Sequence, residues 1–166
     1  MVTSSTQADF FRVQLYPAGA NSLAQTRLLI PLDNMLEVMT LPRQAICPVP
    51  GVAPGVLGVT NQRGQLIWVV DRRSPKGLGT SAARPNPQEK LTVVLLSQGD
   101  GGQVGFVVSQ LEGIAPFDLG VAAPVATAWQ GFYPHCDRQL VRGPEKGFTL
   151  AMAHLSQYLQ GTLVNQ

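Results

Sequence analysis

Short apolar runs separated by polar corners recur along the whole chain. The clearest case is a pair of apolar runs, residues 56–59 and 66–70, that flank a polar corner. Short β-branched runs bounded by glycine predict buried strands. Gly64 permits the positive φ of a tight reversal, and Asn61 tolerates it next best. The stretch therefore predicts a rigid hairpin that holds Arg63 at a fixed place.

Similar apolar runs predict further strands before and after this hairpin. They cover residues 11–16, 27–32, 91–96, 103–109, 139–142 and 148–153, and residues 111–114 continue the fourth of these strands after a bend. At residues 32–41 the pattern fits either a helical turn capped by Asp33 or a bent strand, and the sequence does not decide between them. Residues 118–131 are expected to be irregular or briefly helical. Residues 154–159 carry apolar side chains on one face and predict a short terminal helix.

Two segments are expected to be irregular, and the second of them contains little that could be buried. Residues 42–54 hold four prolines, which favour an extended and irregular course. Residues 72–90 hold three further prolines among glycine, serine and basic residues. This second segment predicts a long loop or linker between two halves of the chain.

Composition favours an all-β architecture. Apolar residues make up 45% of the chain and charged residues only 13%, well below the usual ~25% of charged residues. The 17 glycines and 13 prolines are spread along the sequence and punctuate many short elements. A chain of 166 residues with this composition can bury a real core, in one domain or in two small ones that share it.

The positive charge is concentrated in one segment. The formal net charge is +2, but residues 72–90 contain five of the twelve basic residues and one of the ten acidic ones, which leaves seven basic and nine acidic residues elsewhere. Binding to a phosphate backbone requires a basic face. No nucleic acid is therefore expected as a partner. The alternative function is a small β-barrel nucleic-acid-binding module of the OB or SH3 type.

The sequence contains no pattern of export or of membrane insertion. Residues 1–9 are polar and lack the basic and apolar regions of a signal peptide. No apolar run approaches the ~18–20 residues that span a bilayer. Cys47 and Cys136 are expected to stay reduced, and whether they meet is left open. We expect a cytoplasmic protein without direct membrane insertion.

Patterns that would support catalysis or metal binding fail on spacing. His135, Cys136 and Asp137 are adjacent, and three neighbouring side chains cannot all point at one ion. Neither histidine has a nucleophile in a strand-to-helix turn. The glycine-rich run 99–105 lacks the register of a dinucleotide-binding loop and predicts a hairpin turn. We expect no enzyme activity, no catalytic, cofactor-binding or metal-binding residues, and no cofactor.

Glu37 and Arg63 are the most informative charged residues, because each lies beside apolar neighbours. Two interpretations are open. They are two exposed charges, or they form a partly buried bidentate pair that fixes the hairpin corner against the segment around Glu37. Asp71 is a second candidate partner for the arginine.

The aromatic residues fall mostly within apolar strands and predict core positions. Trp129, Phe132 and Tyr133 form the exception, because they cluster around Gly131 in a loop and could anchor a protein partner there. Stacking platforms for single-stranded nucleic acid need aromatic residues interleaved with basic ones, and this chain does not show that pattern.

A set of motifs extends from the first predicted strands to the last hairpin. In the first half they are Ile30-Pro31-Leu32, Leu36-Glu37-Val38, Pro48-x-Pro50, Gly55-x-x-Gly58, Asn61-x-Arg63-Gly64 and Val69-Val70-Asp71. In the second half they are the run from Val104 to Val108, the late hairpin and the short terminal helix. Together, over roughly residues 10–159, they resemble the CheW-like domain of bacterial chemotaxis coupling proteins. Arg72 stands where this family usually has leucine, and Gln62 also replaces a commoner leucine.

The resemblance implies an all-β fold of two small five-stranded β-barrel subdomains that share a core, with a short C-terminal helix. It implies a flexible N-terminus at residues 1–9 and a single domain at 10–160, divided into a first barrel at about 10–71, a loop at 72–90, a second barrel at about 91–153 and a helix at 154–160.

The resemblance also implies a non-enzymatic signalling adaptor. Such proteins couple the helical cytoplasmic tips of methyl-accepting chemoreceptors to the regulatory domain of a CheA-type histidine kinase, in chemotaxis, phototaxis or twitching motility. They are cytoplasmic and are recruited to receptor arrays at the membrane. Receptor helices are expected in the groove between the barrels, and the kinase at the barrel ends. The residues expected to bind partners, in this groove and at the hairpin corner, are Glu37, Val38, Asn61, Gln62, Arg63 and Gly64.

Overall fold

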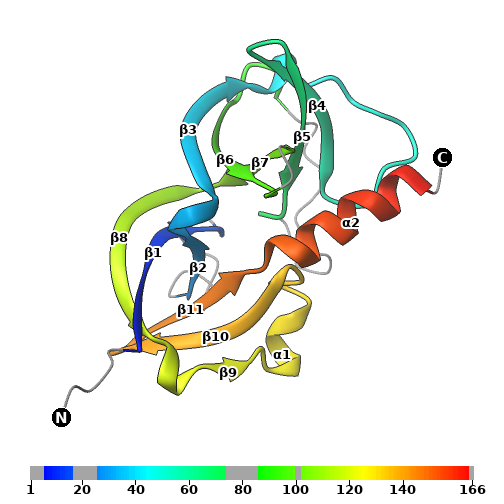
Figure 1. Ribbon diagram of the computed structural model, residues 1–166. Helices are drawn as coiled ribbons and strands as arrows, with labels where there is room; N and C mark the ends of the chain where they lie inside the picture. The colour runs from blue at the N-terminus through cyan, green and yellow to red at the C-terminus, as the bar shows by residue number, and fades with distance from the viewer. Residues whose placement is uncertain (1–5, 17–25, 74–85, 100–101, 165–166) are drawn as a thin grey trace.

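The apolar runs of the sequence form two β-sheets, followed by a C-terminal helix (Figure 1). The structure, a computed structural model, describes residues 6–16, 26–73, 86–99 and 102–164. Sheet A contains, in spatial order, β8 (Gln110–Asp118), β1 (Gln7–Gln14), β2 (Thr26–Pro31), β11 (Glu145–Leu150), β10 (Cys136–Arg142) and β9 (Ala123–Pro124). Sheet B contains β3 (Met35–Pro42), β6 (Lys90–Ser97), β7 (Gln103–Val108), β5 (Gln65–Asp71) and β4 (Val56–Gln62). The expected all-β fold is confirmed.

Each sheet takes strands from both halves of the chain. The sequence placed one barrel at residues 10–71 and the other at 91–153, whereas β1 and β2 lie in sheet A and β3 to β5 lie in sheet B. The 3-10 turn η2 (Leu32–Asn34) carries the chain from sheet A to sheet B, and Ser109 carries it back from β7 to β8. This assignment of strands to barrels was wrong, because apolar periodicity identifies strands but not their partners.

The strand count and several boundaries also differ from the expected ones. Sheet A has six strands rather than five, because the two-residue β9 pairs with β10. Residues 7–9, expected in the flexible N-terminus, belong to β1 and pair with β8. At residues 32–41 the sequence left a helical turn and a bent strand open, and the structure has both, the turn η2 followed by the strand β3. Helix α2 (Met152–Val164) is longer at both ends than predicted. Most of the predicted loop at 72–90 lies outside the described residues.

The predicted irregular segments contain short elements. The segment 42–54 begins with the 3-10 turn η3 (Arg43–Ala45). The segment 118–131 contains the turn η4 (Leu119–Val121), then β9 and the one-turn helix α1 (Thr127–Gln130). The brief helix expected in the second segment is therefore present.

The central strands are buried on both faces, which explains their apolar residues at successive positions. Consecutive side chains of a strand point to opposite faces. In β6, Val93 lies in a core inside the curve of sheet B, and Val94 lies in a larger core between the two sheets. In β2, Leu29 lies in a core inside sheet A, and Leu28 lies in the core between the sheets. One shared core therefore joins two smaller ones.

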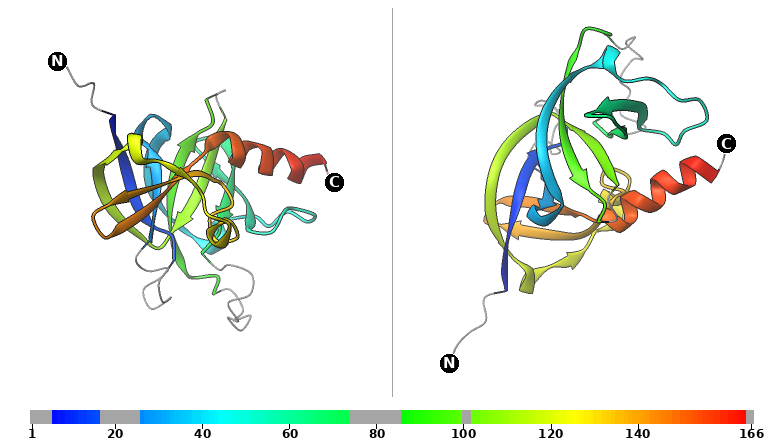
Figure 2. Two further views of the ribbon diagram at one scale, coloured as in Figure 1. Left: turned by 90° about the horizontal axis from the view of Figure 1, so that it is seen from below. Right: turned by 45° about the horizontal axis from the view of Figure 1, so that its top comes forward.

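Helix α2 covers part of the shared core. Leu155 and Leu159 are buried in it, one helical turn apart, as the predicted apolar face requires. The helix starts where β11 ends, and its C-terminal end points away from sheet A (Figures 1 and 2).

The aromatic cluster near Gly131 belongs to this shared core. Tyr133 is 2% exposed and its ring stacks on Phe148 at a centroid distance of 4.2 Å. Trp129 and Phe132 are half-buried and pack against the same core. Tyr133 is therefore a core residue and not an anchor for a partner, whereas Trp129 and Phe132 keep part of their surface exposed, and their role as an anchor stays a prediction.

A glycine lets the segment after β3 cross the first hairpin. Gly58 has a φ of +143°, and a Cβ atom there would lie 2.0 Å from the carbonyl oxygen of Cys47. Cys47 and Val59 exchange two backbone hydrogen bonds of 2.7 and 2.9 Å at the same crossing. The crossing therefore requires a residue without a side chain at position 58.

Gly58→Ala should lower the free energy of unfolding by about 3 kcal/mol or more, because the methyl group collides with backbone at an unfavourable φ. Urea denaturation measures the change. Gly131→Ala is the matched control, since a Cβ there has no atom within 4 Å. Equal unfolding midpoints for the two variants would contradict the close crossing.

His135 is buried beside α2 and is uncharged at neutral pH. It is 4% exposed, and its ring centroid lies 4.6 Å from that of Tyr158. Burial, together with the positive charges of Arg72 and His154, lowers the pKa of His135 from 6.5 to about 4. Its Nε2 atom has no hydrogen-bond partner among the described residues. Protonation of His135 therefore opposes folding.

The stability of the protein should fall as the pH drops below 6.5, because the unfolded chain then binds a proton that folded His135 accepts only near pH 4. Below about pH 4, the free energy of unfolding should be roughly 3 kcal/mol lower than at neutral pH. Urea denaturation at a series of pH values measures the slope. His135→Gln should remove this slope, and the control His154→Gln should keep it. An unchanged slope in His135→Gln would refute the assignment.

Candidate functional site

The hairpin between β4 and β5 is a two-residue turn with Arg63 at its tip. Arg63 has a φ of +52° and Gly64 a φ of +83°, and positive φ at both central residues characterises the type I′ turn. The side chain of Asn61 accepts a 2.9 Å hydrogen bond from the N–H of Gly64. The sequence assigned positive φ to Gly64 and allowed it at Asn61. Gly64 does adopt positive φ, but the second residue with positive φ is Arg63 and not Asn61. Asn61 stays in the strand and supports the turn through its side chain.

The conformation of Arg63 carries a cost that the folded chain does not recover. Left-handed backbone at a residue with a Cβ atom costs roughly 1–2 kcal/mol. Arg63 is the one non-glycine residue with positive φ in the described part of the chain. Its side chain is 77% exposed, so little packing offsets the cost. A strained and exposed arginine is typical of a binding residue.

Glu37 lies on β3, which is the edge strand of sheet B opposite to β4, and its side chain contacts the hairpin corner. Its Oε2 lies 3.2 Å from Nη2 of Arg63, and its Oε1 accepts a 3.2 Å hydrogen bond from Nε2 of Gln62. The Glu37 side chain is 30% exposed. The ion pair between Glu37 and Arg63 therefore lies at the surface. The interpretation in which the arginine is partly buried is wrong. Such a pair contributes below about 1 kcal/mol to stability.

The pair lines an open depression of about 430 Å³, which we call the corner depression. Its lining residues are Leu36, Glu37, Gln62, Arg63, Gln65, Leu95 and Gln103. Glu37 points into it because Glu37 pairs with Leu95, on the face that leads into the core of sheet B. The structure thus brings Glu37, Gln62 and Arg63 together, with Asn61 and Gly64 shaping the turn.

Asp71, the second candidate partner of Arg63, binds a different arginine. Its carboxylate accepts two 3.0 Å hydrogen bonds from the guanidinium of Arg73 and one from the Arg73 N–H. Arg73 also lies 3.6 Å from Glu89, and Glu89 forms a 3.0 Å ion pair with Arg43. These four alternating charges, which we call the clasp, join the end of β5 to the start of β6.

Val38 lies on the opposite face of β3 from Glu37. It pairs with Val94, which belongs to the core between the sheets, so its side chain extends that core to the surface. Val38 is 38% exposed. The predicted site therefore divides into two surfaces on the two faces of one strand.

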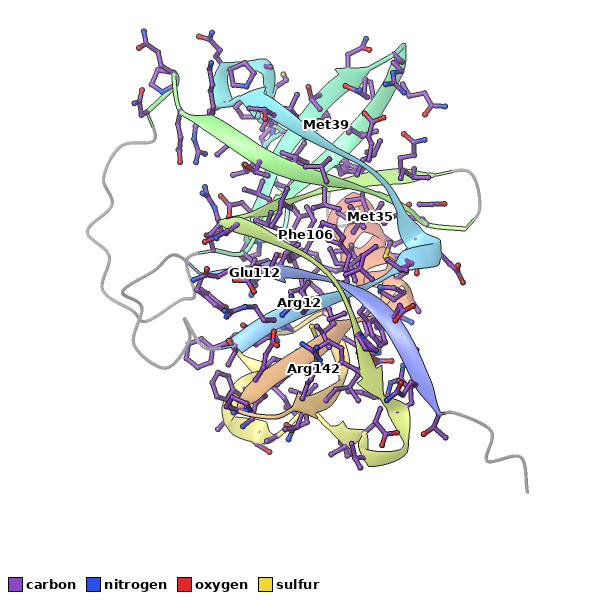
Figure 3. The ribbon with its side chains drawn as sticks, turned by 90° about the vertical axis from the view of Figure 1, so that its left-hand side faces the viewer. Arg12, Met35, Met39, Phe106, Glu112 and Arg142 are labelled. Atoms are coloured by element: carbon purple, nitrogen blue, oxygen red, sulfur yellow. The ribbon has the colours of Figure 1, made fainter. Side chains whose placement is uncertain are left out.

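Sequence reasoning missed the residues that complete this second surface. Ile114 of β8 pairs with Phe11, which packs against the shared core, and Ile114 is 59% exposed. Leu111 of β8 is 37% exposed and Met35 of β3 is half-buried. We call these four residues, Met35, Val38, Leu111 and Ile114, the seam face. Figure 3 looks onto this side and labels Met35 at the start of β3.

Ile114 carried no clear local signal in the sequence. It stands between Gly113 and Ala115 in a run that the sequence identified only as a continuation after a bend. Leu66 was also missed as a surface residue, since it was counted within a buried strand. It is 73% exposed and pairs with Asn61, on the opposite face of β5 from Gln65, which lines the corner depression.

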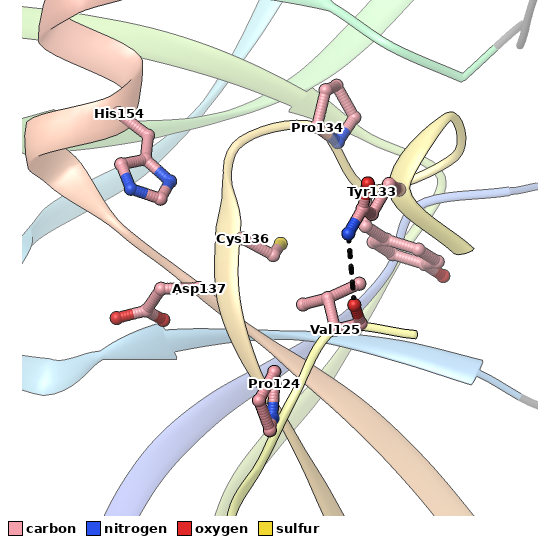
Figure 4. A pocket seen from close by; sticks show the side chains of 8 residues that line it. Pro124, Val125, Tyr133, Pro134, Cys136, Asp137 and His154 are labelled. Carbon is pink, nitrogen blue, oxygen red and sulfur yellow. Dashed lines mark hydrogen bonds between the residues drawn. The ribbon is translucent and has the colours of Figure 1, made fainter. Parts of the chain in front are cut away.

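Two residues of the run His135-Cys136-Asp137, Cys136 and Asp137, line another pocket, of about 490 Å³ (Figure 4). Asp137 and His154 lie on one side of the β10 backbone, and the Cys136 side chain points to the other side. Burial raises the pKa of the Cys136 thiol well above its usual value. Among the described residues, no three His, Cys, Asp or Glu side chains are grouped so that they could hold a metal ion.

The two cysteines are both free thiols, with Cys47 exposed and Cys136 buried. Of the helices in the described ranges, none is both long and apolar enough to cross a bilayer.

Comparison with known proteins identifies the fold and the family. The crystal structure of the scaffolding protein TtCheW from Thermoanaerobacter tengcongensis superposes with a TM-score of 0.61, at 17% sequence identity, over 86% of this chain and 88% of that chain. No curated protein matches the chain. The family profile of the CheW-like domain matches residues 21–132. With two thirds of its length in this match, the chain belongs to the CheW-like domain family.

Proposed function

We propose that this protein is a signalling adaptor that couples chemoreceptors to a CheA-type histidine kinase. CheW-like proteins are scaffolds without catalytic activity. The observation that carries the proposal is that β3 presents two different surfaces, the seam face and the corner depression, on its two sides. One rigid strand can thus hold two partners at once.

The seam face suits a receptor helix. Its apolar side chains continue the shared core outward from both sheets, so a helix with an apolar stripe would bury them against that core. Val38 lies at the edge of sheet B and Ile114 at the edge of sheet A. A helix along the seam would therefore contact both sheets. The cytoplasmic tip of a chemoreceptor is the helical partner that we propose.

The corner depression suits the regulatory domain of the kinase. It lies at an end of sheet B, where Arg63 presents an exposed cation and Leu36 an exposed apolar side chain. Arginine and a neighbouring apolar anchor are typical of residues that dominate binding energy. Glu37 and Gln62 hold the corner in place by their contacts.

Binding both partners to one molecule raises the effective concentration of each partner near the other. No catalytic step by the adaptor is needed for this coupling. We place the protein in the cytoplasm, recruited to receptor arrays, with chemotaxis, phototaxis or twitching motility as the process served.

The alternative, a nucleic-acid-binding module, finds little support in the arrangement of the arginines. Arg12, Arg27, Arg43, Arg63 and Arg73 each form an ion pair with a carboxylate. Arginines paired in this way do not form a free basic face for phosphates. Titration with single-stranded oligonucleotides at two salt concentrations tests the alternative, which predicts tight binding that weakens steeply with salt.

Arg63→Ala and Arg63→Gly should both weaken binding of the kinase regulatory domain about tenfold or more. Arg63→Gly should be at least as stable as the wild type, because glycine adopts positive φ without strain. Calorimetric titration measures affinity, and urea denaturation measures stability. Arg138→Ala, at a 44% exposed arginine of β10, is the control. Unchanged affinity for both kinase and receptor would refute a binding role for Arg63.

Val38→Ser and Ile114→Ser should each weaken binding of a receptor-tip fragment by about fivefold or more, because each removes apolar contact area. Kinase binding should stay within about twofold, since these side chains face away from the corner depression. The matched control is Val141→Ser, at a 49% exposed valine of β10. Equal receptor binding by all three variants and the wild type would exclude the seam face as the receptor site.

A further inference from the structure

The two sheets share one strand arrangement. In sheet B, the edge strand β3 pairs antiparallel with the hairpin β6–β7, and β7 runs parallel to β5 of the hairpin β4–β5. In sheet A, the strand β8 pairs antiparallel with the hairpin β1–β2, and β2 runs parallel to β11 of the hairpin β10–β11. The order β1 to β5 is therefore repeated by β6, β7, β8, β10 and β11. We call residues 6–73 the N-half and residues 86–164 the C-half.

The repeat extends to single residues. In β3 the register shift leaves Leu36 unpaired opposite β6, and in β8 the corresponding shift leaves Glu112 unpaired opposite β1. Two residues after each bulge stand Val38 and Ile114, which both extend the shared core to the surface. The five equivalent strands of the two sheets therefore share their pairing, the position of the bulge, and the face on which Val38 and Ile114 lie.

The halves exchange strands. The N-half contributes β1 and β2 to sheet A and β3 to β5 to sheet B, and the C-half contributes β6 and β7 to sheet B and the rest to sheet A. Four strand pairings join one half to the other, namely β1–β8, β2–β11, β3–β6 and β5–β7. Neither half contains a complete sheet, so a lone half would expose unpaired strand edges and the apolar residues of every core.

The charges of the two halves are complementary. The sequence up to residue 73 has six basic and four acidic residues, and the sequence from residue 86 has four basic and six acidic residues. Ion pairs between the described parts of the two halves join an arginine of the N-half to a glutamate of the C-half in every case. They join Arg12 to Glu145, Arg27 to Glu112 and to Glu145, and Arg43 and Arg73 to Glu89.

The pairs formed by Glu112 and Glu145 are shielded from solvent more than the pair at the corner. The side chains of Arg12 and Glu145 are 21% and 17% exposed, against 77% for Arg63. Reduced solvent contact strengthens the attraction between opposite charges and makes their geometry selective. The interface between the halves therefore combines strand pairing, apolar burial and oriented charge.

We propose that the two halves are partners that recognise each other without the covalent connection between them. The N-half presents the unpaired edges and the arginines, and its partner is the C-half with the matching edges and glutamates. The covalent connection raises the effective concentration of one half near the other, and the contacts that we propose hold the halves together lie within residues 6–73 and 86–164.

The test is to cut the folded, full-length chain. A protease recognition sequence inserted within residues 74–85 allows cleavage under native conditions. At micromolar concentration the cut protein should elute as one species with the mass of the uncut protein. Its urea unfolding midpoint should rise with protein concentration, whereas that of the uncut protein should stay constant. Separate elution of the fragments, or a midpoint that is independent of concentration in the cut protein, would overturn the proposal.

Two glutamate variants test the role of charge in this recognition. Glu145→Gln removes contacts that cross between the halves, and Glu37→Gln removes a contact within the N-half. In the cut protein, Glu145→Gln should weaken association of the fragments about tenfold or more, and Glu37→Gln should change it less than twofold. Equal effects of the two variants would overturn the assignment of charge complementarity to this interface.

Discussion

Burial of the central strands on both faces is the constraint on which the other features depend. Because neighbours such as Val93 and Val94 enter different cores, each strand joins an inner core to the shared core. A one-residue slip of register would exchange these side chains between cores of different size. Strand register, the position of α2 and the relation between the sheets are therefore fixed by the same packing.

Edge strands and turns carry the surface chemistry because the central strands have no free face. β3 pairs with one neighbour only, so Glu37 and Val38 on its two sides can face outward in different directions. The hairpin tip with Arg63 lies beyond the sheet ladder and can accept a strained backbone without breaking a buried contact. The proposed adaptor function uses the parts of the fold that packing leaves unoccupied.

The sequence was sufficient for most strands and for the hairpin, because these depend on local patterns. The apolar runs and the polar corner around Gly64 predicted the hairpin, whereas for Glu37 and Arg63 both two exposed charges and a contact stayed open. The exchange of β3 and β8 between sheets could not be predicted, because pairing is decided by contacts between distant segments. For the same reason Ile114 was not recognised as a partner of Phe11 across the sheet.

The clasp determines how the chain tolerates a change in the length of the segment that it closes. Arg73, between Asp71 and Glu89, fixes both ends of the segment 74–85 at neighbouring points on sheet B. The entropy of loop closure grows slowly with loop length, so doubling the number of residues between two fixed ends costs only about 0.6 kcal/mol. Insertions at this point would therefore add new sequence to the adaptor at little thermodynamic cost, while the packing of both sheets stays unchanged.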